Sequence, residues 1–444
     1  MKYDVLVAGG GSAGVAAAVS AAALGAKTCI IECGKRLGGM ASLALVHSIC
    51  GLYDVVEPSK DASPVYANDG FSKFFAEQLI ASGGAERPVR LGRVNVLFHD
   101  PVSFAETAAH LVKACEKNLL CMLNSEICGA APDLSSLEFV SKGQVQKITA
   151  RSYVDASGDA VLASLCGAVC ERAEPRRLQR PAFIFSVGGV AAEVVNTTGR
   201  LRLAKALGEA VKMGDLPTAA YGVTARAAHR EGDIFFTVNL EADFSKMNFG
   251  KKMSAEEVYD PLDASQRSFL KSQGQIFAHD LIEYLQKKLE GFSSCYLSTL
   301  PDCLGVRESR RVRGRYQLTA EDLDVARRFE DGIGRATWPI ELREKANAVH
   351  LQYPKVSGGC DLPLRILQSE NREALFMAGR CVSAVHEAQA AVRVIGTCLV
   401  TGEAAGIAAA LRARGEEVSA QAIKEARKFL VGRAYRPIIS PTGC

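Results

Sequence analysis

The sequence predicts an α/β fold built on a parallel β-sheet with a second region of α+β character, and one domain interrupted by another fits the length as well as two in series. Three observations lead to this prediction. The 444-residue chain opens with a short apolar strand, a glycine-rich turn, a helix of small residues and a second strand. Another apolar strand and a long small-residue helix lie between residues 374 and 411. In the intervening part, from about residue 174 to 338, strand-like runs alternate with polar helical runs, as in a separate layer.

The composition is that of a soluble globular protein. Hydrophobic residues make up 48% of the chain and charged residues 23%, and the net charge is only +4, so we expect no nucleic-acid partner. No run reaches the ~18 unbroken apolar residues of a membrane span. The first strand begins at once, which leaves no room for a signal peptide, and we therefore expect a cytoplasmic protein.

The 14 cysteines show no CxxC spacing, which argues against a zinc site or a thioredoxin-like redox pair. Many of them lie inside apolar runs, where a free thiol packs as a small hydrophobic group. No cluster of histidine, cysteine and aspartate has metal-ligand spacing either. We expect structural thiols and no metal.

The glycine-rich turn has the spacing of a dinucleotide-binding site. Residues 3–8 form the strand, and Gly9, Gly11 and Gly14 follow in GxGxxG order. Gly9 permits the tight turn, Gly11 lets a pyrophosphate approach the backbone, and Gly14 lets the helix lie close to the strand. Ser12 opens that helix, whose N-terminus favours phosphate. Glu32 ends the second strand and can accept hydrogen bonds from ribose hydroxyls.

Three further stretches carry a family resemblance. They are "CGKRLGGM" after Glu32, "ITARSYVDASGD" at residues 148–159, and "ALFMAGR" at residues 374–380 with the helix after it. Together they resemble flavoproteins of the glutathione-reductase superfold. With "CLGVRESRRVRGR" they look like the bacterial FAD-dependent oxidoreductase family, which is distantly similar to fumarate reductase and succinate dehydrogenase flavoproteins.

The resemblance implies a Rossmann-like FAD-binding domain of the glutathione-reductase type. Residues 1–173 and 339–444 would form this domain, and residues 174–338 an inserted α+β substrate or cap domain. The helix beginning near Gly396 would direct its N-terminus toward the flavin ring and stabilise the reduced anion. The resemblance assigns to FAD, besides the glycine turn and Glu32, the residues Gly38, Gly39, Met40, Ser42, Ile127, Ser157, Gly158, Asp159, Gly379, Arg380, Gly396 and Thr397.

Local patterns predict two elements between these motifs. Asp100-Pro101 and the apolar spacing that follows indicate a helix starting at Pro101. Lys142-Gly143 indicates the turn of a hairpin that leads into the strand ending at Asp155.

A flavin oxidoreductase needs a proton acceptor and positive charge near the ring. We expect these functions from four residues, each of which has a structural alternative. His47 and His386 are the candidate bases, or else they form structural hydrogen bonds beside the cofactor. Arg393 binds a substrate carboxylate or holds the C-terminal segment. Arg307 is placed in the site by the resemblance.

Arg307 begins a run of five arginines. A solvated face paired with nearby acids is one interpretation, and attraction of an anionic substrate or RNA is another. Strand alternation would put Arg311, Arg313 and Arg315 on one side. The run comprises Arg307, Arg310, Arg311, Arg313 and Arg315, and the acids are Glu308, Glu321 and Asp322.

The function predicted is FAD-dependent oxidation or reduction of a small organic molecule, with anionic molecules among the candidates, by hydride transfer at flavin N5. No second GxGxxG and no CxxxxC redox pair follow, so the electron acceptor stays open among oxygen, a quinone, a carrier protein and NAD(P). A flavin monooxygenase using NAD(P)H, a non-redox lyase or isomerase and a tRNA-modifying flavoprotein are the alternatives. A covalent flavin link through His47 or Cys50 and a homo-oligomer are both compatible with the sequence.

Overall fold

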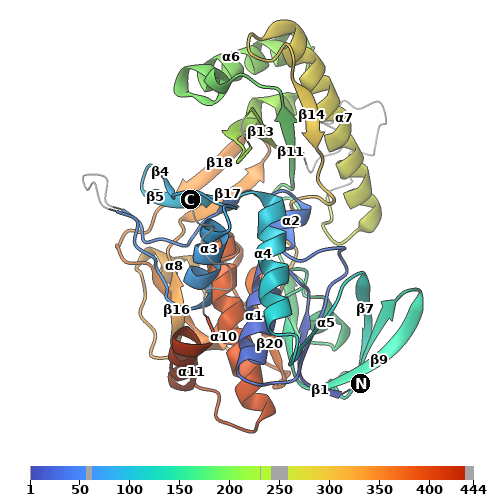
Figure 1. The fold of residues 1–444 in the computed structure, drawn as a ribbon, viewed down its shortest axis with the longest axis vertical. Coiled ribbons are helices and arrows are strands. Elements are labelled where there is room, and N and C mark those ends of the chain that lie inside the picture. Colours follow the sequence, from blue (N-terminus) through green and yellow to red (C-terminus); the bar gives the residue numbers. More distant parts are fainter. Residues whose placement is uncertain (1, 57–62, 231, 242–258, 436–444) are drawn as a thin grey trace.

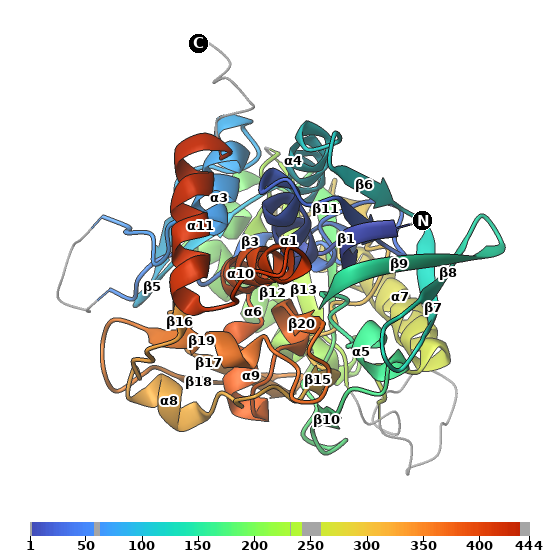
Figure 2. The same ribbon diagram turned by 90° about the horizontal axis from the view of Figure 1, so that it is seen from below.

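The computed structural model describes residues 2–56, 63–230, 232–241 and 259–435, and a largely parallel sheet forms its centre (Figures 1 and 2). Parallel strands occur in the order β6-β2-β1-β9-β20, which confirms the predicted α/β class. In such sheets ligands bind beyond the carboxyl ends of the strands. The strands are β1 (Lys2–Ala8), β2 (Thr28–Ile31), β6 (Leu119–Met122), β9 (Gln144–Asp155) and β20 (Leu375–Met377).

Strand β9 has different partners along its length. Its first residues pair antiparallel with β8 (Leu137–Ser141), which in turn pairs with β7 (Ser125–Ala130). Its last residues pair parallel with β1 and β20. The hairpin predicted at Lys142-Gly143 is confirmed, since both residues have positive φ, 52° and 75°, as a tight two-residue turn requires.

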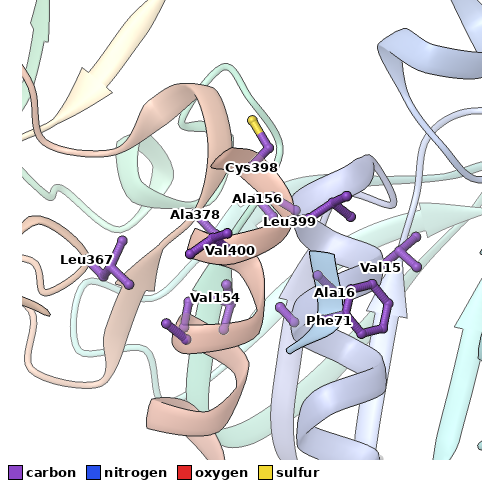
Figure 3. Close-up of a cluster of buried hydrophobic side chains, with 14 of the residues drawn as sticks. Val15, Ala16, Phe71, Val154, Ala156, Leu367, Ala378, Cys398, Leu399 and Val400 are labelled. Atoms are coloured by element: carbon purple, nitrogen blue, oxygen red, sulfur yellow. The ribbon is translucent and has the colours of Figure 1, made fainter. Parts of the chain in front are cut away.

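Helices α1 (Ser12–Ala23) and α10 (Ile395–Ala413) pack against each other with almost no side chain between them. A Cβ on Gly402 would lie 2.2 Å from the carbonyl oxygen of Ala13. The neighbouring side chains, among them Val15 and Leu399, form the main hydrophobic core (Figure 3). Among the described residues α10 has the length and composition of a membrane span, but 94% of its apolar window is buried, so it serves as a core helix.

Further helices surround the sheet. The predicted helix α4 starts at Pro101 as expected, and Asp100 caps it by accepting the N–H of Ser103. These helices are α2 (Met40–Leu43), α3 (Phe71–Ala81), α4 (Pro101–Ala114), α5 (Val161–Leu165), α8 (Ala320–Asp324), α9 (His386–Val392) and α11 (Ala420–Arg433), with 3-10 turns at Ala192–Val195, Thr218–Gly222, Leu364–Ile366 and Gly379–Cys381.

The middle of the chain forms a second, antiparallel sheet in the order β12-β13-β11-β14, seen in the upper half of Figure 1. Its separate hydrophobic core draws only on residues between Phe183 and Val306. The boundaries at residues 174 and 338 stay a prediction. The elements are β11 (Ala182–Gly188), α6 (Thr197–Met213), β12 (Thr224–Ala227), β13 (Ile234–Asn239), α7 (Ala264–Lys288) and β14 (Tyr296–Thr299).

Small sheets connect the two larger ones. Strand β3 lies beside β5, and the β17-β18 hairpin borders the antiparallel sheet. The strands are β3 (Ser48–Ile49), β4 (Val89–Leu91), β5 (Val94–Phe98), β10 (Cys170–Arg172), β15 (Arg310–Val312), β16 (Gly332–Ala336), β17 (Ile340–Lys345), β18 (Ala348–Gln352) and β19 (Cys360–Pro363).

Candidate active site

A cavity of about 1130 Å³ lies at the carboxyl edge of the parallel sheet and reaches the antiparallel sheet. One part, here called the glycine side, is lined by Gly9, Gly11, Glu32 and Ile127. The other, the arginine side, is lined by His47, Trp338 and four arginines at positions 226, 307, 343 and 393. The cavity therefore joins the two halves of the predicted site.

The glycine turn brings backbone to the cavity. Gly9 has a φ of +95°, and a Cβ there would lie 2.7 Å from the carbonyl oxygen of Ala156. A Cβ on Gly14 would lie 1.9 Å from the carbonyl oxygen of Gly9, so only glycine lets α1 approach the turn. Gly11 and Ser12 line the cavity. No described side chain caps α1, which leaves its first N–H groups for an anion.

Glu32 fastens the turn to β2. Its carboxylate is 6% exposed and accepts the backbone N–H groups of Gly10 and Gly34. The same side chain lines the cavity, as Ile127 of β7 does. The predicted contacts of Glu32 with ribose and of Ile127 with adenine stay predictions.

The glycine doublet packs directly on the glycine turn. A Cβ on Gly39 would lie 2.8 Å from the Cα of Gly11, and Gly38 has a φ of +104°. Gly39 and Met40 line the cavity. Gly38 and Ser42 lie behind this lining, and Ser42 donates its hydroxyl at 2.7 Å to the backbone carbonyl five residues earlier. Ser42 thus holds the loop in the structure.

Two predicted motifs far apart in sequence meet at one ion pair. Arg380 donates to the carboxylate of Asp159 at 2.5 Å and to the carbonyls of Gly158 and Val306 at 2.9 and 2.7 Å. Burial opposes the ionisation of Asp159, but the Arg380 charge prevails and lowers the pKa of this carboxyl. Ser157, Gly158, Asp159, Gly379 and Arg380 all line the cavity.

The start of α10 closes the cavity beside β3. Gly396 donates its N–H to the carbonyl of Cys50 at 2.9 Å, and a Cβ on Gly396 would lie 2.6 Å from that oxygen. Gly396 and Thr397 lie behind the lining residues Ile395 and Cys398. The Thr397 hydroxyl is buried and has no hydrogen-bond partner among the described residues. Burial raises the pKa of the Cys50 thiol to about 12, so this thiol stays protonated.

The glycine side fits FAD. It offers an uncapped helix N-terminus for phosphate, a backbone cradle at Gly11, and a carboxylate at the end of the second strand. The orphaned Thr397 hydroxyl just behind the start of α10 is a further polar group without a partner in the described chain.

His47 lies flat between aromatic rings at the arginine side. Its imidazole stacks on Phe235 of β13 with 4.3 Å between centroids and on Phe98 of β5 with 6.2 Å. Its Nδ1 lies 3.2 Å from the carbonyl oxygen of Leu45. A carbonyl only accepts, so Nδ1 carries the proton and Nε2 has the lone pair. Burial lowers the pKa of His47 to about 4, which leaves it neutral at pH 7.

An arginine cluster surrounds one carboxylate. Arg343 donates to Glu341 at 2.8 Å, and Trp338 donates its indole N–H to the same carboxylate at 3.0 Å. Arg393 donates to the amide oxygen of Gln179 and to the backbone carbonyl of Glu341, whereas Arg307 donates to a backbone carbonyl. Burial and mutual repulsion lower the pKa of Arg307 and, with partial compensation by Glu341, of Arg393.

Arg226 of β12 lines the same side of the cavity. Its guanidinium lies 5.6 Å from the ring centroid of Phe98, the ring that also faces His47. Burial is the main cause of a lowered Arg226 pKa, and the nearby Arg200 adds to it. The imidazole and this arginine therefore share one aromatic wall.

His386 is not among the residues that line the cavity. It opens α9, where Nδ1 lies 2.9 Å from Glu308 and Nε2 lies 3.0 Å from Glu344. Burial alone would lower the His386 pKa, but these carboxylates outweigh it and raise the pKa. Both ring nitrogens are thus occupied. Gln389 on the same helix donates to the backbone carbonyl of Arg307 at 3.1 Å, so α9 supports the cavity wall.

The five arginines of the run do not form one solvated face. The interpretation of the run as a solvated charged face is therefore wrong. Arg311 is 5% exposed and forms a buried ion pair with Glu308, whereas Arg313 is exposed and pairs with Glu171. The strand that would align them, β15, ends at Val312. Three acids were expected to pair with the arginines of this run. Among the described residues, only Glu308 does so, with Arg311.

The other two acids have a different partner. Asp322 and Glu321 lie 2.5 and 4.0 Å from Arg327. Arg327 comes from the loop after α8, which the sequence pattern did not connect with them.

The lining residues that the sequence analysis missed include Arg226, Trp338, Glu341 and Arg343 of the arginine side. A signal existed for two of them. In β17 the apolar Ile340 and Leu342 are buried on one face, and strand alternation then puts Glu341 and Arg343 on the other. No described group of three or more histidine, cysteine and acidic residues could hold a metal ion.

Solved structures similar to this one share little sequence with it. A geranylgeranyl bacteriochlorophyll reductase-like protein from Thermoplasma acidophilum is 12% identical, covering 97% of this chain and 84% of its own, with a TM-score of 0.43. The anhydrotetracycline hydroxylase OxyS from Streptomyces rimosus is 12% identical over 99% and 70%, with a TM-score of 0.44. At these values the likeness assigns no activity.

No curated protein matches the sequence significantly. The family model described as "FAD dependent oxidoreductase", in contrast, matches residues 4–430. That match includes the glycine turn, the Asp159–Arg380 pair and α10. The chain therefore belongs to the FAD-dependent oxidoreductase family, and FAD is its cofactor.

Proposed function

We propose that the protein transfers a hydride between FAD and a small organic molecule held at the arginine side of the cavity, as a dehydrogenase or oxidase. The continuity of one cavity from the glycine turn to His47 supports this assignment most directly. When bound, FAD supplies the two-electron chemistry, taking or giving a hydride at N5.

The glycine turn, Glu32 and the Asp159–Arg380 pair would hold the cofactor. His47 would accept, at Nε2, the proton that leaves a substrate O–H or N–H group. Its Nδ1 contact with Leu45 fixes the tautomer, and the stacked ring of Phe235 fixes the orientation. The start of α10 would provide positive charge where the reduced cofactor becomes anionic.

Apolar walls would exclude water from the reacting groups. Val96 and Phe98 of β5, Ile184 of β11 and Ile395 of α10 all line the cavity. A low-dielectric surrounding strengthens each hydrogen bond and charge interaction within it.

Anaerobic flavin bleaching tests the proposal. The FAD-loaded protein is mixed with hydroxy acids, amines, sugars and enoates, and the absorbance near 450 nm is followed, with reduced protein used for the enoates. Loss of absorbance with one class, or its return when the reduced protein meets an enoate, supports hydride transfer and identifies the class. Rapid reduction by NADPH alone with no bleaching by any substrate would instead favour a monooxygenase. A preparation that cannot take up FAD would refute the proposal altogether.

A further inference from the structure

The arginine side of the cavity carries an excess of positive charge that the described residues do not neutralise. Arg226, Arg307, Arg343 and Arg393 line it, and Glu341 is the one carboxylate that lines this side. The other acids of the lining lie on the glycine side of the cavity or form ion pairs there. They are Glu32, Glu126, Asp159 and Asp302.

Within the part of the chain that the structure describes, only Arg343 among these four arginines has its charge matched by a direct carboxylate contact. Arg343 lies 2.8 Å from Glu341. Arg307 and Arg393 donate to neutral acceptors, the Arg180 carbonyl, the Gln179 amide and a Glu341 backbone carbonyl. The Nε of Arg393 is buried without a partner among the described residues. A buried cation without a counterion is costly unless a ligand supplies one.

The surroundings specify the rest of the ligand. The Phe98 ring faces both Arg226 and His47, and Trp338 lines the cavity and donates its indole N–H to Glu341. A molecule in this position meets the apolar surface of Val96, Phe98, Ile184 and Trp338. Polar groups there are the guanidinium groups, His47, Glu341 and the side chains of Thr224, Thr237 and Asn239. Guanidinium groups bind carboxylates through two parallel N–H donors, which fits a single planar anionic group better than a point charge.

We infer that Arg226, Arg307 and Arg393 form a subsite for one carboxylate, and that the substrate is a small monocarboxylate with an apolar body. This inference rests on the proposed function. The Glu341–Arg343 ion pair holds Trp338 and leaves the other three arginines for the ligand. The carbon that gives its hydride to N5 lies on this body and bears the one O–H or N–H group whose proton His47 accepts at Nε2, so that hydride and proton leave together.

Trp338 provides a direct readout of binding. It is the only tryptophan of the chain, it lines the cavity, and its indole N–H binds the carboxylate within the cluster. The FAD-loaded protein is titrated with phenylacetate and with hexanoate, and tryptophan fluorescence is recorded. Phenylacetamide, phenylmethanesulfonate and phenylphosphonate are titrated in parallel. The expected result is saturable quenching by the carboxylates and at least about tenfold weaker binding of the neutral amide.

Variants test which arginines are responsible. Arg393→Gln and Arg226→Gln should each raise the carboxylate Kd at least about tenfold and leave amide binding unchanged. Arg393→Lys should recover part of the loss, because it restores charge without the bidentate geometry. Arg313→Gln is the matched control, since Arg313 is exposed and pairs with Glu171 and Glu370 outside the cavity. Its Kd should equal that of the unchanged protein.

The flavin absorbance separates the two proposals. A protein that retains FAD but binds amide and carboxylate equally would overturn the carboxylate subsite and leave the proposed function standing. Tighter binding of the phosphonate or sulfonate than of the carboxylate would overturn the assignment of ligand class. A carboxylate that binds with unchanged affinity to Arg393→Gln and Arg226→Gln would overturn the assignment of residues. Failure to take up FAD counts against the proposed function alone.

Discussion

The guanidinium of Arg380 lies 2.5 Å from Oδ1 of Asp159, although 221 residues separate them in sequence. The pair joins the loop after β9 to the turn after β20, and both segments line the cavity. Gly158 takes part because a Cβ there would lie 2.9 Å from the Arg380 guanidinium. The two segments of the cavity wall are thereby fixed to each other.

Arg380→Lys should lower FAD occupancy. Lysine keeps the charge but cannot reach Asp159 and the two backbone carbonyls at once. The ratio of absorbance at 450 nm to 280 nm in the purified protein measures this. Arg328→Lys is a matched control, because Arg328 binds Asp361 and two glycine carbonyls away from the cavity. Equal FAD occupancy in the two variants would show that the Asp159–Arg380 pair does not contribute to FAD binding.

Gly402→Ala should destabilise the protein by about 1–3 kcal/mol or more, because the added Cβ meets the backbone of α1. Gly432→Ala in α11 meets nothing within 4 Å and should instead stabilise by up to ~1 kcal/mol. Urea unfolding of both variants measures the difference. If the free energy of unfolding changed in the same direction in both variants, this would contradict the close packing of α1 on α10.

Stability should fall with acid because two histidines are buried. Burial lowers the pKa of His47 and His99 from 6.5 to about 4. The unfolded chain takes up these protons near pH 6.5 and the folded protein only near pH 4. The contribution of these two histidines to the free energy of unfolding therefore decreases as the pH falls from about 6.5 to about 4, and it is constant above about pH 7. Urea unfolding at several pH values tests this. His99→Asn should reduce the slope of the free energy of unfolding against pH. An unchanged slope would contradict this prediction.

His47→Asn should reduce kcat by about 10²–10⁴-fold while FAD stays bound. With the unchanged protein, the acid limb of kcat/KM should show a pKa near 4, below the usual value of 6.5, because burial disfavours the imidazolium. Stopped-flow reduction of the flavin across pH gives both quantities. His110→Asn is the control, since His110 lies on an exposed part of α4. An acid limb near 6.5 would assign the base elsewhere.

The flavin should be released completely when the protein is precipitated with acid. The Cys50 thiol has a pKa of about 12 because of burial, and Cys398 has a similar value, so neither supplies a thiolate for attachment. Absorbance of the supernatant and of the washed pellet measures release. Yellow colour that persists in the pellet, with a matching mass increase on a peptide containing His47 or Cys50, would show a covalent link.

The glycine side of the site could be predicted because its signals are local. The strand, the GxGxxG turn, the helix and Glu32 lie within the first 32 residues, and each residue type has a steric or hydrogen-bonding reason. The Asp159 and Arg380 motifs were also visible, but their direct contact was not, because it depends on β20 pairing beside β9.

The arginine side could be predicted only in part. Arg226, Glu341 and Arg343 come from short strands of two different sheets, and only the tertiary arrangement brings them to His47. Sequence spacing also suggested that His386 faces the substrate, because it follows the Gly379-Arg380 turn closely. The first turn of α9 directs its ring to two glutamates instead.

The change of partners along β9 has a consequence for synthesis on the ribosome. The hairpin with β8 uses neighbouring residues and can form as soon as β9 emerges. The last parallel strand, β20, must wait until residues 156 to 374 have been made. During that interval the edge of β9 that β20 will cover has unpaired N–H and C=O groups. Ribosome-bound chains that stop before β20 should therefore need chaperones more than chains that extend beyond it.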